Sequence, residues 1–309
     1  MIDIKKIKLK NEQDIISSWN DKEKIMVTVV CAAFNQELYI EDAIISFLMQ
    51  DTNFAFEIII HDDASIDKTA DIIRGYQNKY PNIIKPIFQE ENQYSKGGFK
   101  PSAYVAPFAK GEYIALCEGD DYWIDSNKLS KQLNVMQRDV NCKICFHPSI
   151  ALYSDGQTQD ISYHQSNECK FNLKTIFLSG GGFCPTASLF IETKVLLNMP
   201  EWFYTKAPFG DFYIQVIAAS KGGYALYMPD KMSVYRKNSL GSWSESQNNN
   251  VNLIYKEMAR TLEADIELAK YLKLNKYLQM RRALYVKFQR SKSLIIKRKL
   301  LDAIKIFMV

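Results

Sequence analysis

The chain has 309 residues, of which 47% are hydrophobic and 24% charged, and its formal net charge is +4. This balance is ordinary for a soluble globular protein with one large domain or two modest ones. No run of about 18 apolar residues is present, and residues 1–14 lack the continuous apolar core of a signal peptide, so we expect neither a membrane-spanning helix nor export.

The six cysteines are scattered, and several lie inside apolar runs. This distribution favours reduced, buried thiols over a disulfide framework and predicts a cytoplasmic protein. Cys142 and Cys145 form one CxxC pair, but no second pair and no suitably spaced histidine accompanies it. Burial in a strand is therefore favoured over a zinc site.

The charge is unevenly distributed along the chain. Residues 270–309 contain twelve Lys or Arg and one acidic residue, Asp302, which leaves the rest of the chain mildly acidic. Such an asymmetry indicates two regions with different partners.

The first part of the chain alternates apolar, β-branched runs with segments of helical periodicity. Alternation of this kind predicts the α/β class, with an open, mixed and mostly parallel sheet covered by helices on both faces. We expect strands at 25–34, 56–61, 83–89 and 112–117, separated by helices at 35–50, 62–80 and 101–111.

The pattern loosens after residue 150. We expect a loop at 153–168, a glycine-rich turn leading to a strand at 177–191, a helix at 209–223, a pair of strands at 224–236 and helices from about 250. The expected organisation is an N-terminal extension (1–24), two halves of one domain (25–125 and 126–245) and a basic C-terminal helical region (246–309).

Polar residues follow the expected strands at 32–37, 61–65, 91–100 and 118–123, and two of these segments contain aspartate pairs. Ligands of open α/β sheets bind at the carboxyl ends of the strands. A single acidic turn is compatible with a solvated loop or a helix cap, but two that converge on one sheet edge favour a site for Mg²⁺ or Mn²⁺. A nucleotide diphosphate is the natural partner of such an ion.

Neither GxGxxG after the first strand nor GxxxxGK[ST] occurs. The sequence therefore argues against a dinucleotide-binding dehydrogenase and against a P-loop ATPase. Because no glycine-rich phosphate loop is present, we expect a metal ion to neutralise the diphosphate.

Four segments, "VTVVCAAFNQELYIEDAIISFLMQ", "EIIIHDDASIDKTADII", "AKGEYIALCEGDDYW" and "YRKNSLGSWS", together resemble the family 2 inverting glycosyltransferases of the GT-A fold. The resemblance covers roughly residues 25–245 and is greatest to bacterial enzymes that build capsule, lipopolysaccharide or other surface glycans. It implies a Rossmann-like GT-A sheet followed by a C-terminal helical extension.

The resemblance also implies roles for individual residues. Asp121 corresponds to the direct metal ligand, and Asp211 to the general base that takes a proton from the acceptor hydroxyl. A helix cap is the alternative for Asp211. The positions that correspond to nucleotide contacts are Ala32, Ala33, Glu37, Asp63 and Asp120.

The chain departs from the family pattern at two places. Gly210 precedes Asp211 where relatives often carry Glu, and Asn238 stands where relatives often place a metal-binding histidine. Lys96 and Arg236 are candidate diphosphate contacts. Trp123 and Trp243 are candidates for the acceptor site, with packing in the core as the alternative.

The expected function is metal-dependent, inverting transfer of a hexosyl or N-acetylhexosaminyl group from a nucleotide sugar, UDP-linked by preference, to a glycan or polyprenyl-linked hydroxyl. Two alternatives remain, a catalytically silent carbohydrate-binding or scaffold protein and a sugar nucleotidyltransferase. For residues 270–309, contact with the inner, anionic membrane surface and packing on the domain or on the second subunit of a homodimer both remain open. Nucleic-acid binding is not expected.

Overall fold

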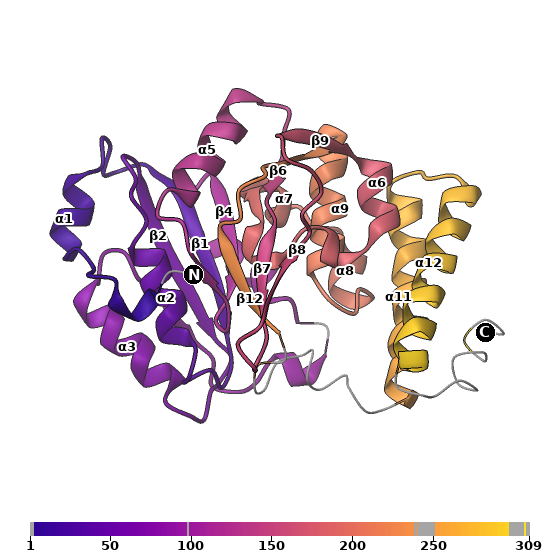
Figure 1. Cartoon of the computed structure of the whole chain (residues 1–309), viewed down its shortest axis with the longest axis horizontal. Helices are drawn as coiled ribbons and strands as arrows, with labels where there is room; N and C mark the ends of the chain where they lie inside the picture. The colour runs from indigo at the N-terminus through magenta and orange to yellow at the C-terminus, as the bar shows by residue number, and fades with distance from the viewer. Residues whose placement is uncertain (1–2, 98, 238, 240–250, 297–305, 307–309) are drawn as a thin grey trace.

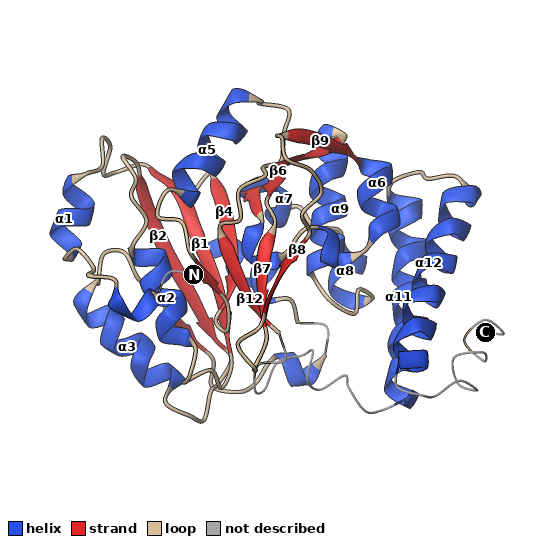
Figure 2. Ribbon diagram, in the orientation of Figure 1, coloured by secondary structure: helices blue, strands red, loops and turns tan. Residues whose placement is uncertain are grey.

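The computed structural model describes residues 3–97, 99–237, 239, 251–296 and 306. This part of the chain forms twelve strands and eleven α-helices, and Figures 1 and 2 show how they are arranged. The strands are β1 (Ile25–Ala33), β2 (Ala55–Asp62), β3 (Ile87–Phe88), β4 (Tyr113–Glu118), β5 (Tyr122–Trp123), β6 (Ile144–Phe146), β7 (Ser149–Leu152), β8 (Thr158–Ile161), β9 (Cys169–Asn172), β10 (Phe190–Glu192), β11 (Tyr224–Tyr227) and β12 (Ser233–Arg236). The helices are α1 (Glu12–Ser17), α2 (Ile40–Leu48), α3 (Thr69–Lys79), α4 (Pro101–Val105), α5 (Lys128–Arg138), α6 (Leu173–Ser179), α7 (Thr193–Leu197), α8 (Glu201–Thr205), α9 (Asp211–Gly222), α11 (Val251–Tyr271) and α12 (Lys276–Ile296).

The central sheet has eight strands in the order β3-β2-β1-β4-β10-β6-β11-β9. Strands β3, β2, β1 and β4 are parallel, whereas β10 is antiparallel to both of its neighbours, β4 and β6. The sheet is therefore mixed and mostly parallel, as the sequence predicts. Since β10 (Phe190–Glu192) lies between strands from the first part of the chain and β6, residues 25–125 and 126–245 share one sheet.

Alternating side chains of β1 enter two separate cores. Val29 and Cys31 join the core beneath α2, α3 and α5, and Val30 joins the core on the opposite face, beneath α4 and α9. This arrangement explains the nearly continuous apolar run of the strand, because both of its faces are covered. It also leaves the carboxyl ends of β1, β2 and β4 as the places where polar side chains can gather.

The structure corrects two expectations. The segment 153–168, predicted as a loop, contains β8, which pairs antiparallel with β7. Its side chains are largely exposed, so no apolar alternation marks it as a strand. The strands predicted as a pair at 224–236 do not pair with each other, because β11 lies in the central sheet and β12 in a second sheet of order β5-β12-β7-β8.

Proline shortens two other elements. The helix predicted at 101–111 ends as α4 at Val105 and continues as a 3₁₀ turn that contains Pro107. The strand predicted at 83–89 is reduced to β3, preceded by Pro86 and by an isolated bridge between Ile84 and Ile58.

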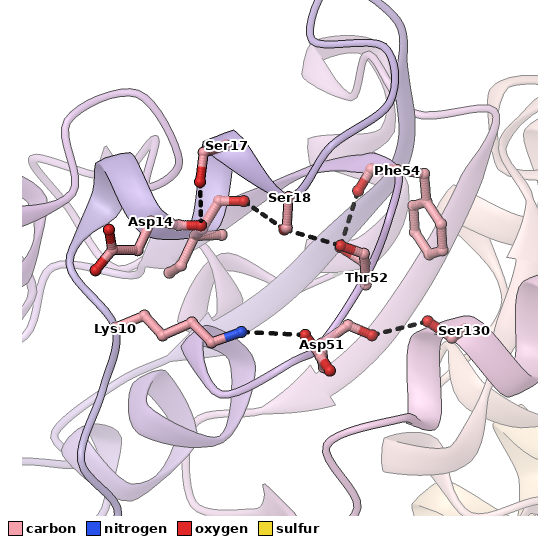
Figure 3. Close-up of polar contacts among 9 residues, drawn as sticks. Lys10, Asp14, Ser17, Ser18, Asp51, Thr52, Phe54 and Ser130 are labelled. Atoms are coloured by element: carbon pink, nitrogen blue, oxygen red, sulfur yellow. Dashed lines mark hydrogen bonds and ion pairs between the residues drawn. The ribbon is translucent and has the colours of Figure 1, made fainter.

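The N-terminal segment is fastened to the domain by polar contacts, shown in Figure 3. Ser18 donates to the carbonyl of Thr52 at 3.0 Å, and Lys10 pairs with Asp51 at 3.1 Å. Ser130 at the start of α5 donates to the carbonyl of Asp51 at 2.9 Å. The segment before β1 is thus tied to the loop that precedes β2.

Helices α11 and α12 lie side by side at the end of the molecule opposite α1 (Figure 1). Ala264, Leu268 and Ala269 of α11 are fully buried in the core that covers α9. Arg282 of α12 is buried in an ion pair with Asp265 of α11 at 2.8 Å. The inward faces of these helices therefore pack on the domain. This is one of the two alternatives that the sequence left open for the basic region.

Candidate functional site

Three carboxylates lie together where β4 ends. Glu118 is the last residue of β4, and Asp120 and Asp121 occupy the turn before β5. One oxygen from each of Glu118, Asp120 and Asp121 lies within 4.8 Å of the others. The turn fits closely against β1, since the amide of Gly119 donates to the carbonyl of Ala32 at 2.9 Å.

Gly119 is required by this close approach. A Cβ atom there would lie 2.3 Å from Oε1 of Gln36 and 2.9 Å from Cδ1 of Ile40. The glycine between the acids therefore sets the position of the turn against the loop after β1.

Residues from β12 and the segment after it hold the two aspartates in place. The backbone amide of Arg236 donates to Asp121 Oδ1 at 2.9 Å, and the Arg236 guanidinium donates to the carbonyl of Asp120 at 2.8 Å. Ser239 Oγ donates to Asp120 Oδ2 at 2.6 Å. The turn at residues 118–121 is thus fixed by a segment more than 100 residues later in the chain.

The Arg236 guanidinium is itself anchored. It forms a short ion pair with Asp42 of α2, in which the two side chains are 14% and 8% exposed, and it lies 4.5 Å from the centre of the Tyr122 ring. Arg236 was predicted as a diphosphate contact; in the structure its guanidinium contacts Asp42, the carbonyl of Asp120 and the Tyr122 ring.

Burial raises the pKa of all three carboxyls. It raises the pKa of Asp121 well above its usual range, with the charges of Asp120 and Glu118 adding to the effect. Glu118 is exposed, but desolvation by the neighbouring protein, together with the charges of Asp120 and Asp211, raises its pKa to about 8. Three crowded carboxyl groups with raised pKa values are the environment in which a divalent cation is favourable, because the cation offsets the repulsion between them.

The oxygen donors therefore fit Mg²⁺ or Mn²⁺, both of which prefer carboxylate ligands. Glu118, Asp120 and Asp121 would hold the ion, with Asp121 the most deeply buried of the three. When bound, such an ion supplies positive charge to a departing diphosphate.

Asp211 begins α9 and faces the glycine-rich turn at residues 180–182. A Cβ on Gly181 would lie 3.0 Å from Asp211 Oδ2, so a larger residue there would crowd the carboxylate. Within the part of the chain that the structure describes, buried Oδ1 of Asp211 accepts no hydrogen bond. Burial raises the pKa of Asp211, and the charge of Asp211 contributes to the raised pKa of Glu118.

Asp63 follows β2 and is 5% exposed. Its two carboxylate oxygens accept hydrogen bonds from the amides of Gln93 and Tyr94 at 2.8 and 2.9 Å, and its own amide donates to the carbonyl of Ala33. Asp63 therefore joins the loop at residues 89–97 to the end of β1. Glu37 is exposed and accepts from the amide of Lys68 at 3.0 Å, near the start of α3.

Of the remaining predicted residues, Lys96 and Trp123 contact other protein groups, and two lie outside the described part of the chain. Lys96 is an exposed residue paired with Glu91 at 2.6 Å. Trp123 is fully buried and donates its indole N–H to the carbonyl of Ala187 at 2.9 Å, which favours the core alternative for this residue. Asn238 and Trp243 lie outside the described residues.

Sequence reasoning gave no role to Glu118, Asp42 or Ser239. Asp42 had a detectable signal, because it interrupts the apolar face of α2 and is buried, a position that requires a partner of opposite charge. Ser239 has no such signal, since only the fold brings it to Asp120.

The fold and the acids at its strand ends are those of an α/β enzyme that binds a ligand at the carboxyl edge of the sheet. The sequence profile described as "Glycosyl transferase family 2" matches residues 28–195. The chain belongs to this family and is a glycosyltransferase with the GT-A fold.

Relatives and solved structures agree with this assignment. An uncharacterized protein of Mycobacterium tuberculosis is 34% identical over 249 residues, covering 78% of this chain and 68% of that protein. The putative teichuronic acid biosynthesis glycosyltransferase TuaG of Bacillus subtilis is 28% identical over 241 residues, which cover 77% of this chain and 90% of TuaG. A shorter match, 36% identical over 37% of this chain and 42% of that protein, is to the Escherichia coli UDP-Glc:alpha-D-GlcNAc-diphosphoundecaprenol beta-1,3-glucosyltransferase WfaP.

Among solved structures, S. aureus TarS 1-349 in complex with UDP-GlcNAc matches with a TM-score of 0.59 at 17% identity, covering 91% of this chain and 90% of that one. The mannosyltransferase PcManGT from Pyrobaculum calidifontis, in complex with GDP-Man and Mn²⁺, matches with a TM-score of 0.56 at 14% identity. The match covers 91% of this chain and 73% of that one. These similarities show the fold.

Proposed function

We propose that the protein transfers a hexosyl or N-acetylhexosaminyl group from a UDP-sugar to a hydroxyl of a glycan or polyprenyl-linked acceptor, with inversion at the anomeric carbon, in the synthesis of a surface polysaccharide. The observation that carries the proposal is the cluster of Glu118, Asp120 and Asp121 at the carboxyl end of β4. The names of TuaG, WfaP and TarS support the class of donor and product.

In this proposal the ends of β1 and β2 receive the nucleoside, at Ala32, Ala33 and Asp63. The acid cluster holds Mn²⁺ or Mg²⁺, which supplies charge to the leaving diphosphate. Asp211 takes the proton of the attacking hydroxyl on its carboxylate. The metal ligands and the base are then different residues, so each role can be tested by substituting one residue without the other.

The test uses the purified chain with UDP-Glc, UDP-GlcNAc and GDP-Man, each with Mn²⁺ and with EDTA. We expect Mn²⁺-dependent binding of a UDP-sugar by calorimetry, and its loss in Asp121→Asn. In Asp211→Asn we expect donor binding to persist while transfer falls by roughly 10²–10⁴ fold, the usual contribution of a general base. Asp71→Asn, which changes an exposed aspartate, is the matched control.

Two results would contradict the proposal. Binding of UDP-sugar that is equal with Mn²⁺ and with EDTA would remove the role of the metal site. Full transfer activity in Asp211→Asn would show that Asp211 is not the base.

A further inference from the structure

The two long faces of α12 differ in character. The inward face carries buried Arg282, which lies over the Phe212 ring, and buried Val286, which packs with Ile254 and Met258 of α11. The outward face carries four large side chains that are each more than half exposed, at spacings of three or four residues, and therefore aligned along one side of the helix. This outer stripe consists of Tyr277 (58% exposed), Met280 (56%), Leu284 (51%) and Phe288 (57%).

The charges of α12 are divided in the same way. The helix contains six Lys or Arg and no Asp or Glu. Arg282 and Arg290 form ion pairs with Asp265 and Glu257 of α11, at 2.8 and 3.7 Å. The inward-facing cations are therefore matched by acids.

The other four cations flank the outer stripe. With 100° between successive residues, Arg281 and Lys292 fall on one side of the stripe, and Lys276 and Lys287 fall on the other. None of these four forms a salt bridge within the described part of the chain. The exposed face of α12 is thus an apolar stripe between two basic edges.

We propose that this face is a docking surface for an anionic lipid bilayer, with α12 lying parallel to the membrane plane. The Tyr, Met, Leu and Phe side chains would enter the boundary between headgroups and acyl chains, about 5–10 Å deep, while Lys and Arg contact the phosphates. The proposal goes beyond the transferase function and depends on none of its site residues. It assigns to the exposed half of α12 a role distinct from the packing of its buried half.

A bilayer fits this surface better than a second copy of the chain does. Two copies paired through their outer stripes would bring the basic edges of both helices together, and like charges across an interface oppose association. Stable protein interfaces also bury about 800 Å² on each partner, which is more than one row of four side chains provides. An anionic lipid surface avoids the charge repulsion, because its charge is opposite to that of the basic edges. It also needs no complementary protein interface of that area, because the bilayer extends along the whole helix.

The experiment is flotation of the full-length protein with vesicles of phosphatidylcholine, with or without phosphatidylglycerol. We expect binding to the phosphatidylglycerol vesicles that weakens as salt is added. The triple variant Arg281→Gln, Lys287→Gln, Lys292→Gln is expected to lower the partition coefficient about a hundredfold, or roughly fivefold per cation. The control replaces three exposed lysines far from α12, in Lys8→Gln, Lys22→Gln, Lys79→Gln, and is expected to bind as wild type.

A second arm tests the apolar stripe. Leu284→Ser with Phe288→Ser is expected to lower partitioning at least about tenfold, while Val140→Ser, at a 76% exposed valine elsewhere, leaves it unchanged. In Phe288→Trp, we expect the tryptophan emission to shift to shorter wavelength when phosphatidylglycerol vesicles are added. Far-UV circular dichroism and cooperative urea unfolding report that every variant is folded.

The proposal is overturned if the wild-type chain does not float with phosphatidylglycerol vesicles. It is also overturned if both α12 variants bind as well as wild type. A wild-type dimer in sedimentation equilibrium that dissociates in the Leu284→Ser, Phe288→Ser variant would assign the stripe to self-association instead. Loss of donor binding with vesicle binding retained would count against the transferase function alone.

Discussion

Residues 25–125 and residues 126–296 contribute to the site in different ways. The first region places Asp63, Asp120 and Asp121 at the ends of neighbouring parallel strands, where their position follows from short sequence motifs. The second region supplies Arg236 and Ser239, which bind Asp121 and Asp120 from 115 and 119 residues away in the sequence. Local pattern therefore determines where the acids lie, and distant residues determine how they are oriented.

Removing Arg236 tests the contribution of the second region most directly. In Arg236→Met, the carboxylate of Asp42, whose side chain is 8% exposed, loses its counter-charge. Breaking a buried ion pair on one side costs about 3–5 kcal/mol, so we expect a loss of that size in the free energy of unfolding. Urea denaturation measures it, and weaker Mn²⁺ binding should accompany it because the Asp120 carbonyl loses its donor.

The matched control is Arg74→Met, which breaks an ion pair with Asp71 in which the side chains are 53% and 79% exposed. Surface pairs contribute about 1 kcal/mol or less, so this variant should unfold close to wild type. Equal effects of the two substitutions would mean that the burial of Arg236 does not set the strength of its ion pair.

Gly119→Ala tests the first region with a smaller change. The added Cβ would meet Gln36 Oε1 at 2.3 Å, which can move, and Ile40 Cδ1 at 2.9 Å, which is buried. Overpacking of this kind costs about 1–3 kcal/mol and should displace the turn that carries Asp120 and Asp121. Gly182→Ala, with no atom within 4 Å of the new Cβ, is the control for stability. Normal Mn²⁺ binding in Gly119→Ala would show that the turn tolerates the displacement.

The sequence predicted the fold class and the strand ends well because both depend on neighbouring residues. The runs at 25–34 and 56–61 are apolar since both faces of β1 and β2 are covered, and that pattern is visible without a structure. The grouping of Glu118 with the aspartates was missed, since composition does not show which carboxylates of "EGDD" face one another. β8 was missed because its side chains face solvent, where no apolar periodicity is required.

The pH dependence of transfer separates the proposed base from the metal ligands. Because burial raises the pKa of Asp211, the protonated, inactive form should persist above the ordinary aspartate range near pH 4. With Mn²⁺ and donor saturating, kcat should fall about tenfold per pH unit below that raised pKa, whereas titration of the metal ligands appears in the donor KM. An acid limb of kcat that remains near pH 4 would contradict the burial of the Asp211 carboxylate as the cause of its pKa shift.

Lys128 gives the smallest expected effect and tests the core that both regions share. Its ammonium is buried 3.9 Å from the centre of the Trp123 ring and donates to Gln132 Oε1 at 2.6 Å. Burial lowers its pKa from 10.5 to about 7, so between these values the unfolded chain binds more protons than the folded protein. The contribution of Lys128 to the free energy of unfolding therefore rises with pH across this window, by no more than about 1.4 kcal/mol per pH unit.

We expect the difference in unfolding free energy between Lys128→Met and wild type to change in one direction between pH 7 and pH 9. Relative to wild type, the variant should be most stable at pH 7 and lose that advantage as the pH rises, because the buried charge disappears from the wild-type protein. Lys131→Met serves as the control, since the ion pairs of Lys131 with Asp125 and Asp230 raise its pKa and keep it charged throughout this range. Urea titrations at pH 7, 8 and 9 distinguish the two cases, and a difference for Lys128→Met that stays constant with pH would show that the buried ammonium keeps its proton.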